Sequence, residues 1–506
     1  MRQPLTLLLT ASALPALLAA TPALAGTTDD QVRELADRLE RLEADNARLR
    51  AEMGTMQDQR DAVPAPPPPP PPMTAANGPH WSDEDGRRAD KDEPRKAVGI
   101  SLGYSFDMLD HAEGVNKRLI RQLQARQNDE LDSIVTLGGS VVAIANAHFS
   151  NRADKFGYLM RHPTPNNQRT KHTQEITLAS AQLAFTVTPN DYITAYAELL
   201  YDPEQSFGAG TLTALGRNQI QLRKGWVMFG NLNESPLYAA IGKMDVPFGL
   251  EDTVSPYTNS TNWHAFAPLA YGGQVGYLKD GLSVRAMAVM GGSQFRGANV
   301  PVDGTSIPAK MNNFAVDASY TYKFGEDAQA MLGGSYIHGS AYCQGYPVVH
   351  FNPCTDNVPA WSAYGTLNLG RLKVLGEFAQ TTTAWPGTQV PDPANPLSQF
   401  AASKVTSLTA GGRYNLSNPD SPTNLSLEYS RFQAGPDGAP WHRQNQVVAG
   451  LSHRVSRSVD LFGEAIHTDG FAPLNFISGG NQPGGATWSD ASARSNVLML
   501  GVQAAF

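Results

Sequence analysis

Along much of this 506-residue chain, apolar and polar side chains take turns with a period of two. The clearest case is residues 313–324, where every even position from Phe314 to Phe324 is apolar and the odd positions are mostly polar. A period of two is the repeat of a β-strand, so this segment has one apolar and one polar side. The pattern predicts a sheet whose two faces meet different surroundings.

Sixteen segments follow this pattern, and the connections between them alternate between short turns and long loops. An even number of such strands, with short turns at one end and long loops at the other, is typical of an outer-membrane barrel. We therefore expect residues 132–506 to form an all-β, 16-stranded antiparallel transmembrane β-barrel. The segments lie near 133–149, 173–187, 192–201, 217–230, 236–247, 271–278, 282–291, 312–324, 328–338, 360–369, 371–381, 404–416, 422–432, 443–455, 458–468 and 492–506.

A soluble β-sandwich is the alternative reading of the same alternation. Its strands are usually five or six residues long, and its loops show no regular change of length. Apart from the N-terminal leader, no run of 18 apolar residues occurs, which excludes a helical membrane protein. The net charge of -8 argues against a nucleic-acid partner.

The N-terminal region is organised differently from the strands. Residues 1–25 combine an early Arg2, an apolar run and a small-x-small cleavage site, which predicts a secretory signal peptide. Residues 26–60 are expected to form a coiled coil, because apolar residues follow 3,4 spacing through residues 29–56. This coil predicts a homo-oligomer, and Asn46 at an a position favours dimers. Residues 61–96 form a Pro-rich, disordered linker, with seven prolines from Pro66 to Pro72.

Residues 97–131 are a pre-barrel segment of ambiguous type. Residues 97–106 alternate like a strand, but counting them would give an odd number of strands and place the termini on opposite sides. Residues 113–130 are basic and helix-like. Such a helix can plug a pore or link the coil to the barrel, and linking is the favoured reading.

The inward positions of the strands are expected to line a water-filled pore, because sixteen strands enclose a lumen. Both signs of charge occur there, so no strong ion preference follows. Lys224 is the misfit, because it falls on the apolar face between Leu222 and Trp226, where a bulge at Gly225 or snorkelling to the rim would relieve it. The predicted lining residues are Glu198, Arg223, Arg285, Asp317, Lys373, Glu377, Arg413, Glu428, Asp460 and Glu464.

Aromatic residues occur near the ends of those strands that run toward the short turns and the C-terminus. They predict a ring of aromatic side chains at one membrane–water interface. They are Phe185, Phe229, Tyr277, Phe324, Tyr414 and Phe506. The last segment also resembles the C-terminal signature of outer-membrane proteins, a final Phe preceded by apolar residues at alternate positions. That resemblance implies recognition of Phe506 by the barrel-assembly machinery.

Residues 242–249, GKMDVPFG, resemble the GK-x-x-x-PFG segment of Gram-negative porins. The layout of coil, linker and barrel resembles the LbtU-type siderophore porins, with phosphate-selective and carbohydrate porins as near alternatives. The resemblance implies outer-membrane lipid around the barrel, the coil in the periplasm, trimers rather than the dimers that Asn46 favours, and passage of small hydrophilic solutes or iron chelates. It also implies that the third long loop folds into the lumen, where Glu251, Asp252, Tyr257, Trp263 and His264 would form the pore constriction. The alternative is that these five residues cap the extracellular mouth.

Cys343 and Cys354, with ten residues between them in a long loop, predict one disulfide. We expect no metal site and no cofactor, because the nearby histidines lack a paired ligand spacing. Enzyme motifs are absent except for G-x-S-x-G at residues 99–103, which lacks the strand-turn-helix setting of a nucleophile, so no enzyme activity is expected. The alternatives to a diffusion channel are a peptidoglycan-tethering or adhesin protein that works through its coil and, more weakly, an outer-membrane hydrolase.

Overall fold

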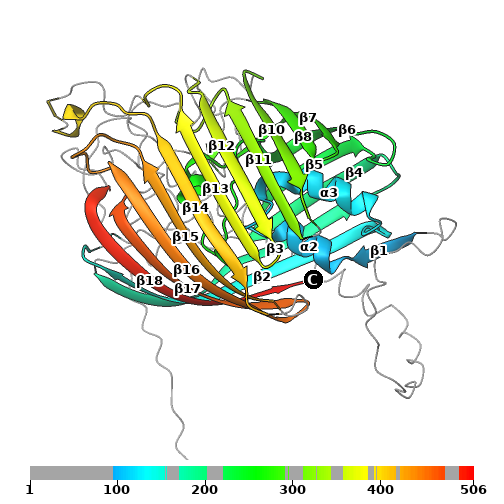
Figure 1. Ribbon diagram of the computed structural model, residues 1–506, viewed down its shortest axis with the longest axis horizontal. Coiled ribbons are helices and arrows are strands. Elements are labelled where there is room, and N and C mark those ends of the chain that lie inside the picture. The colour runs from blue at the N-terminus through cyan, green and yellow to red at the C-terminus, as the bar shows by residue number, and fades with distance from the viewer. Residues whose placement is uncertain are drawn as a thin grey trace, which may run out of the picture. The chain divides into compact units, whose positions relative to one another are not determined.

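A computed structural model describes residues 95–153, 155, 170–201, 220–290, 294–295, 311–325, 327–342, 357–385, 393–394, 396–417, 422–472 and 489–506. Within these residues sixteen strands form a closed antiparallel β-barrel, with two further short strands, β1 and β9, attached to it (Figure 1). The predicted signal peptide, coiled coil and linker, and both cysteines, lie outside the described residues.

Each barrel strand pairs antiparallel with the strand before and after it in the chain. The barrel strands are β2 (Ser133–Ser150), β3 (His172–Val187), β4 (Ile193–Tyr201), β5 (Ile220–Gly230), β6 (Leu237–Asp245), β7 (Pro268–Lys279), β8 (Leu282–Val289), β10 (Asn313–Lys323), β11 (Ala328–Ile337), β12 (Ala360–Leu369), β13 (Leu372–Thr381), β14 (Thr406–Asn415), β15 (Thr423–Gln433), β16 (Arg443–Ser456), β17 (Val459–Phe471) and β18 (Asp490–Ala505).

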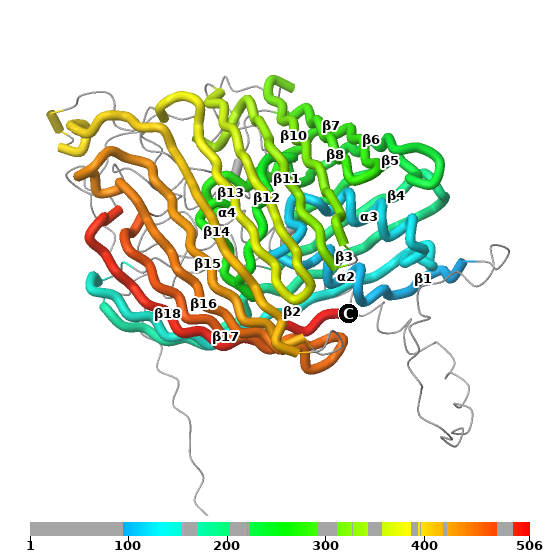
Figure 2. The backbone as a smooth tube through the Cα atoms, viewed as in Figure 1, coloured from blue at the N-terminus to red at the C-terminus, as the bar shows by residue number. Residues whose placement is uncertain are grey.

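The last strand closes the cylinder against the first. Strand β18 runs beside β2 (Figure 2). In β18, Ser495 lies opposite Ser150 of β2, and Ala505 lies opposite Ser140. The fold class predicted from the sequence is confirmed, and the strand limits agree closely: residues 360–369 were expected as a strand and β12 spans the same residues. The alternating pattern predicts the strand limits well because each strand has to keep one face toward the lumen and the other toward the outside of the barrel.

The outer face of the barrel is apolar and exposed, whereas the inner face is buried. Ile176, Leu332 and Leu500 are 88%, 73% and 70% exposed. Large apolar side chains are rarely so exposed on a protein surface that faces water. A continuous belt of such side chains is the surface expected to contact lipid.

Strand β5 corrects the prediction for Lys224. The register of β5 against β4 shifts between Glu198 and Leu199, so that Arg223 is the extra residue of a β-bulge. The bulge turns Lys224 inward, where its Nζ lies 2.6 Å from the Asp245 carboxylate. A bulge does relieve the misfit, but it lies at Arg223, not at Gly225, and it moves Trp226 to the buried side as well.

The chain before the barrel forms a short strand and three helical elements. These are β1 (Lys96–Ile100), α2 (Leu102–Leu109), the 3-10 helix η1 (Val115–Lys117) and α3 (Arg118–Gln127). Of the residues 97–106 that alternate like a strand, only those up to Ile100 form one, and the rest belong mostly to α2. Strand β1 pairs parallel with β2, so that Ile100 lies opposite Leu137. Phe506 pairs with Gly139 through two backbone hydrogen bonds of 2.9 Å, so β1 and β18 occupy successive stretches of the same edge of β2.

Three smaller elements lie in the long connections. They are β9 (Gln294–Phe295), α4 (Thr261–Phe266) and the 3-10 helix η2 (Pro396–Gln399). Helix α4 begins after Ser260, whose side chain accepts a 3.2 Å hydrogen bond from the backbone N–H of Trp263. This N-cap fixes the start of the helix inside the barrel.

Candidate functional site

The connection between β6 and β7, residues 246–267, runs along the inner wall of the barrel and is called the inner loop below. Nearly all of its residues are buried. Its helix α4 contacts β13, β14 and β15, which lie across the lumen from the strands that the loop connects. The loop therefore crosses the interior of the barrel.

Three glutamates on alternate strands hold the inner loop by its backbone. Glu377 of β13 accepts hydrogen bonds from the N–H groups of Leu250 and Glu251, at 2.9 and 2.8 Å. Glu428 of β15 accepts from the N–H of Val254 at 2.9 Å and from the Thr253 hydroxyl at 2.7 Å. Glu464 of β17 accepts from the N–H groups of Tyr257 and Thr258 at 2.6 and 3.0 Å.

The spacing of these three contacts follows from the geometry of the wall. Alternate strands are about 10 Å apart, and an extended chain covers that distance in about three residues. The loop accordingly meets a new glutamate every three to four residues. Gly249 permits the first contact, because its φ is +73° and a Cβ there would lie 2.2 Å from the Glu377 carboxylate.

The structure places all five predicted constriction residues inside the barrel, on the inner loop. Glu251, Asp252, Tyr257, Trp263 and His264 are each less than 10% exposed. The ring of Tyr257 stacks on Phe462 of β17 with centroids 5.4 Å apart. The loop thus lies in the lumen and not over its mouth, and a direct contact of these side chains with solute stays a prediction.

Each of the ten predicted lining residues is engaged by another part of the protein. Arg285 binds Asp317 at 2.7 Å, and Arg223 lies 3.3 Å from Glu198. Asp460 binds Arg454 at 2.9 Å. Glu377, Glu428 and Glu464 hold the inner loop, and Lys373 and Arg413 both bind Glu113. These charges therefore fix the contents of the lumen as well as the wall.

Residues 101–131, called the plug below, lie against the inner wall near the short-turn end of the barrel. The hydroxyl of Tyr104 lies 2.8 Å from that of Thr186 in β3, and the indole N–H of Trp226 in β5 donates to Gln122 at 3.0 Å. Arg126 donates to the hydroxyl of Thr194 in β4 at 2.7 Å. The linking role favoured from the sequence is therefore incomplete, because this segment packs into the lumen.

The turn between the plug helices, residues 110–117, meets the inner loop. The N–H of Thr253 donates to the carbonyl of Ala112 at 2.8 Å. Asn116 donates to the carbonyls of Phe248 and Gly249 at 3.0 and 2.9 Å. The plug and the inner loop, which the sequence separates by more than a hundred residues, thus form one assembly inside the barrel.

Charges at this contact have shifted protonation equilibria. Burial and the neighbouring Glu113 raise the pKa of the Asp110 carboxyl to about 6. Burial opposes ionisation of Glu113, but Lys373 and Arg413 outweigh it and lower its pKa to about 2. Burial, followed by the nearby Glu377, raises the pKa of Glu251 well above its usual value. Within the part of the chain that the structure describes, neither oxygen of the Glu251 carboxyl has a hydrogen-bond partner.

A cavity of about 1080 Å³ remains between the plug and the wall formed by β8, β10 and β11. It begins among the short turns at residues 232–236 and 278–281 and reaches Lys117 and Met331. Its lining carries carboxylates, amides, hydroxyls and cations, which is the chemistry of a path for hydrophilic solutes.

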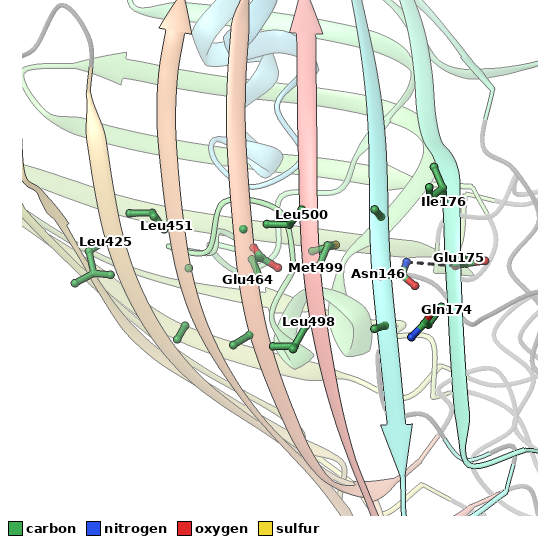
Figure 3. A pocket seen from close by; sticks show the side chains of 16 residues that line it. Asn146, Gln174, Glu175, Ile176, Leu425, Leu451, Glu464, Leu498, Met499 and Leu500 are labelled. Atoms are coloured by element: carbon green, nitrogen blue, oxygen red, sulfur yellow. Dashed lines mark hydrogen bonds between the residues drawn. The ribbon is translucent and has the colours of Figure 1, made fainter.

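A second depression, of about 920 Å³, lies on the outer face across β2, β3 and β15–β18. Figure 3 shows Leu425, Leu451, Leu498 and Leu500 around it. Ala145, Ala449, Gly463 and Ala465 also line it, so the apolar belt is hollowed where its side chains are small. This depression belongs to the lipid-facing surface and not to the lumen.

Across the described ranges no group of three or more His, Cys, Asp or Glu side chains is arranged to hold a metal ion. Among the helices that the structure describes, none is both long and apolar enough to cross a membrane.

The sequence reasoning missed Glu113 and Asn116, the residues that connect the plug to the wall and to the inner loop. Their only signal is their position in a turn between two short helical patterns. A local pattern of that kind carries no information on a partner such as Lys373, which lies far away in the chain.

No protein-family model matches the chain. A UPF0422 protein of Coxiella burnetii (strain RSA 493 / Nine Mile phase I) is 22% identical over 284 residues, 53% of this chain and 54% of that protein. UPF0422 protein lpl2888 of Legionella pneumophila (strain Lens) is 26% identical over 207 residues, 40% of this chain and 34% of that protein. The chain thus spans about half the length of the first relative and about a third of the second.

The fold resembles several solved structures, among them a porin and an outer-membrane channel. The anion-selective porin from Comamonas acidovorans is 12% identical with a TM-score of 0.45, covering 74% of this chain and 99% of that one. The outer-membrane channel DcaP of Acinetobacter baumannii is 14% identical with a TM-score of 0.44, covering 74% and 97%. OprB of Pseudomonas putida is 11% identical with a TM-score of 0.43, covering 75% and 96%.

Proposed function

We propose that this chain is an outer-membrane channel for small hydrophilic solutes. The observation that carries the proposal is the division of the barrel into an apolar outside and a charged inside. Residues such as Leu332 and Leu500 are exposed outward, whereas Arg285 and Asp317 pair on the inner wall. A closed sixteen-stranded barrel of this kind is stable in lipid and encloses polar space.

The charges inside predict weak ion selectivity. Arg285 and Asp317, and Arg223 and Glu198, compensate each other within the wall. Glu113 of the plug offsets part of the positive charge of Lys373 and Arg413. A solute therefore meets a surface with many hydrogen-bonding groups and little net charge, which suits neutral or zwitterionic molecules better than a single class of ion.

Several finer points of the proposal come from the sequence. The barrel would lie in the outer membrane with the coil of residues 29–56 in the periplasm, and the coil would join copies of the chain, with trimers favoured. Phe506 would be read by the barrel-assembly machinery. The LbtU-like layout makes iron chelates candidate solutes, beside phosphate and sugars. Membrane fractionation and mass measurement in detergent test the location and the number of copies.

The channel is tested by reconstituting the full chain in planar bilayers and in liposomes. Stepwise ionic conductance, together with liposome swelling that falls as the size of the sugar increases, is the expected result. Growth of a deletion strain on iron chelates, sugars or phosphate then identifies the solute class. Bilayers that stay silent for the wild type and for every opened variant described below would overturn the channel.

A second function is favoured by one observation, the occupation of the lumen by the plug and the inner loop. A barrel filled in this way can serve as an anchor for a periplasmic coil that binds the cell wall. The anchor predicts cosedimentation of residues 26–96 with peptidoglycan and no conductance in any variant, whereas the channel predicts conductance.

A further inference from the structure

The plug is held in the barrel by two kinds of contact on opposite sides. Toward β3–β5 the contacts include the hydrogen bonds of Tyr104 with Thr186, of Gln122 with Trp226 and of the Arg126 guanidinium with Thr194. Toward β13 and β14 the contact is ionic, because the two oxygens of Glu113 bind Lys373 and Arg413. The side of the plug toward β3–β5 is therefore held by hydrogen bonds to the wall, and the ion pairs toward β13 and β14 depend on the single carboxylate of Glu113.

The turn between the plug helices, residues 110–117, is called the plug turn below, and it lies at the inner end of the cavity described above. The Nζ of Lys117 lies 2.9 Å from the sulfur of Met331, at the inner limit of the cavity. Just beyond it, Arg285 of β8 donates to the backbone oxygen of Asn116, and Asn116 donates to the inner loop. A solute that enters from the short-turn end thus meets a continuous set of contacts from the wall through the plug turn to the inner loop.

The inner loop also packs near Met331, where the cavity ends. Leu250 and Val254 pack with Met331, Tyr364 and Leu375 in an apolar cluster. His111 of the plug turn lies 2.8 Å from the carbonyl of Tyr257. These contacts bring the inner loop, the plug turn and the wall together at one level of the barrel.

We infer that the plug is an autoinhibitory element: it closes the proposed channel together with the inner loop, and Glu113 is the latch that keeps it closed. The inference rests on the proposed channel function. Opening separates the plug turn from Lys373, Arg413 and the inner loop and helix α2 from β2 and β3, while helix α3 keeps its contacts with β4 and β5. The cavity along β8, β10 and β11 then continues past Met331.

The local chain geometry suits a movement of this kind. Gly114 follows Glu113 directly, has a φ of +62°, and has open space where a side chain would stand. A glycine at this place lets the turn change direction without a steric penalty. The movement needs only the loss of the hydrogen bonds and ion pairs named above, and no strand of the barrel has to separate.

The first test locks the plug to the wall with an engineered disulfide. A Cβ built on Gly138 of β2 lies 2.9 Å from the Cβ of Ser105 in α2, so the pair Ser105→Cys and Gly138→Cys can be joined after a small shift. The pair is made in the full chain with Cys343→Ser and Cys354→Ser. Ala449→Cys with Ala465→Cys, which face each other on β16 and β17, is the control because it crosslinks the wall alone.

The second test releases the latch. Glu113→Gln keeps the shape of the side chain and removes the charge that binds Lys373 and Arg413. We expect the open probability in planar bilayers to rise about tenfold, because two charge-assisted hydrogen bonds are weakened at a partly exposed site. Asp437→Asn removes an exposed carboxylate that pairs with His442 outside the lumen, and it is the matched control that leaves the open probability unchanged.

A third variant shows whether Glu113 acts through its ion pairs. Lys373→Gln alone should also raise the open probability, and the double variant with Glu113→Gln should raise it by less than the product of the two single effects. Independent, multiplying effects would assign the opening to general loosening of the barrel and would overturn the latch.

The outcomes separate this inference from the channel itself. Openings of Glu113→Gln that vanish when the Ser105–Gly138 disulfide is added by oxidation, and return on reduction, support the autoinhibitory plug. Wild-type conductance that equals that of Glu113→Gln, and that oxidation does not change, overturns the plug and leaves the channel standing. Silence of every variant, in samples shown to be folded by heat-modifiable migration, overturns both.

Discussion

The carboxylate of Glu464 accepts a hydrogen bond of 2.6 Å from the backbone N–H of Tyr257, so a strand side chain holds a loop by its main chain. Its other hydrogen bonds come from the N–H and the hydroxyl of Thr258. An acceptor of this kind specifies where the loop runs and does not depend on the loop's side chains. The same relationship recurs at Glu377 and Glu428, so the position of the inner loop is set by the wall.

Replacing Glu464 by alanine should release the middle of the inner loop. The buried donors of Tyr257 and Thr258 lose their acceptor, at a cost of about 1–3 kcal/mol for each one left unsatisfied. Hydrogen exchange of residues 250–262 should accelerate. Asp460→Asn on the same strand is the control, because Asp460 pairs with Arg454 and not with the loop. Equal exchange in Glu464→Ala and the wild type would contradict the role of Glu464.

Docking of the plug turn should weaken as the pH rises from about 4 to above 6. The pKa of Asp110 is raised from 3.8 to about 6 in the folded protein, so its contribution to docking is complete below pH 3.8 and is lost as the pH passes about 6. The charged groups that act on it are Glu113 and Arg118 of the plug, Arg413 of β14 and, across the lumen, Arg454 of β16.

Pulsed electron paramagnetic resonance can follow this change through spin labels on Gly103 of α2, where a side chain would meet open space, and on Lys279 at the end of β7. The distance distribution should broaden between pH 4 and 7, and Asp110→Asn should remove the broadening. Glu113 acts in the opposite sense at lower pH: its pKa is lowered from 4.5 to about 2, so its contribution is lost as the pH falls through that interval. A distribution that is the same at pH 4 and pH 7 would speak against the role of Asp110.

Removing the cation at Lys224 should destabilise the barrel. Lys224→Met leaves Asp245, which is largely buried, without the ammonium that lies 2.6 Å away. Breaking a buried ion pair on one side costs about 3 kcal/mol. Unfolding by guanidinium in detergent micelles should show the loss, and Lys279→Met in an exposed turn should not. A midpoint unchanged by Lys224→Met would show that the Asp245 carboxylate finds another partner.

An arginine in the middle of the apolar belt should impair insertion into lipid. Leu500→Arg on β18 places a cation on the outer face, at a cost of about 2–4 kcal/mol near the centre of the bilayer. Leu369→Arg lies beside the short turn at Gly370, where the cost falls to about 0–1 kcal/mol. Folding into vesicles, followed by heat-modifiable migration, should therefore be reduced more by the first variant. Equal yields would argue against lipid at Leu500.

The strands were predictable because each one repeats the same two-residue choice of environment. Residues 313–324, for example, needed no knowledge of their partners, since their own alternation fixed both the strand and its outward face. The bulge at Arg223 was not predictable in its position, because an extra residue leaves the sequence pattern broken over Lys224 and Gly225 without saying which residue is the insertion.

The contents of the lumen were harder to predict than its wall. The inner-loop residues Glu251 to His264 were located through a short resemblance at residues 242–249, not through alternation. The pairing of Glu113 with Lys373 and Arg413 joins segments that are distant in the chain, and no local period records it. The partners of the predicted pore-lining charges on the plug and the inner loop were unknown, and the lining of a solute path by these charges stays a prediction.

The shared edge of β2 bears on the order in which the molecule is assembled. Strand β1 pairs with residues only a few dozen positions further along, so it can form as soon as the start of β2 exists. Strand β18 reaches the rest of that edge only after the entire wall has been made. Contacts between distant segments form late because their loop-closure entropy is largest. The plug is thus already tethered beside the seam when the cylinder shuts, so that the proposed autoinhibition would be in place as soon as the barrel is complete.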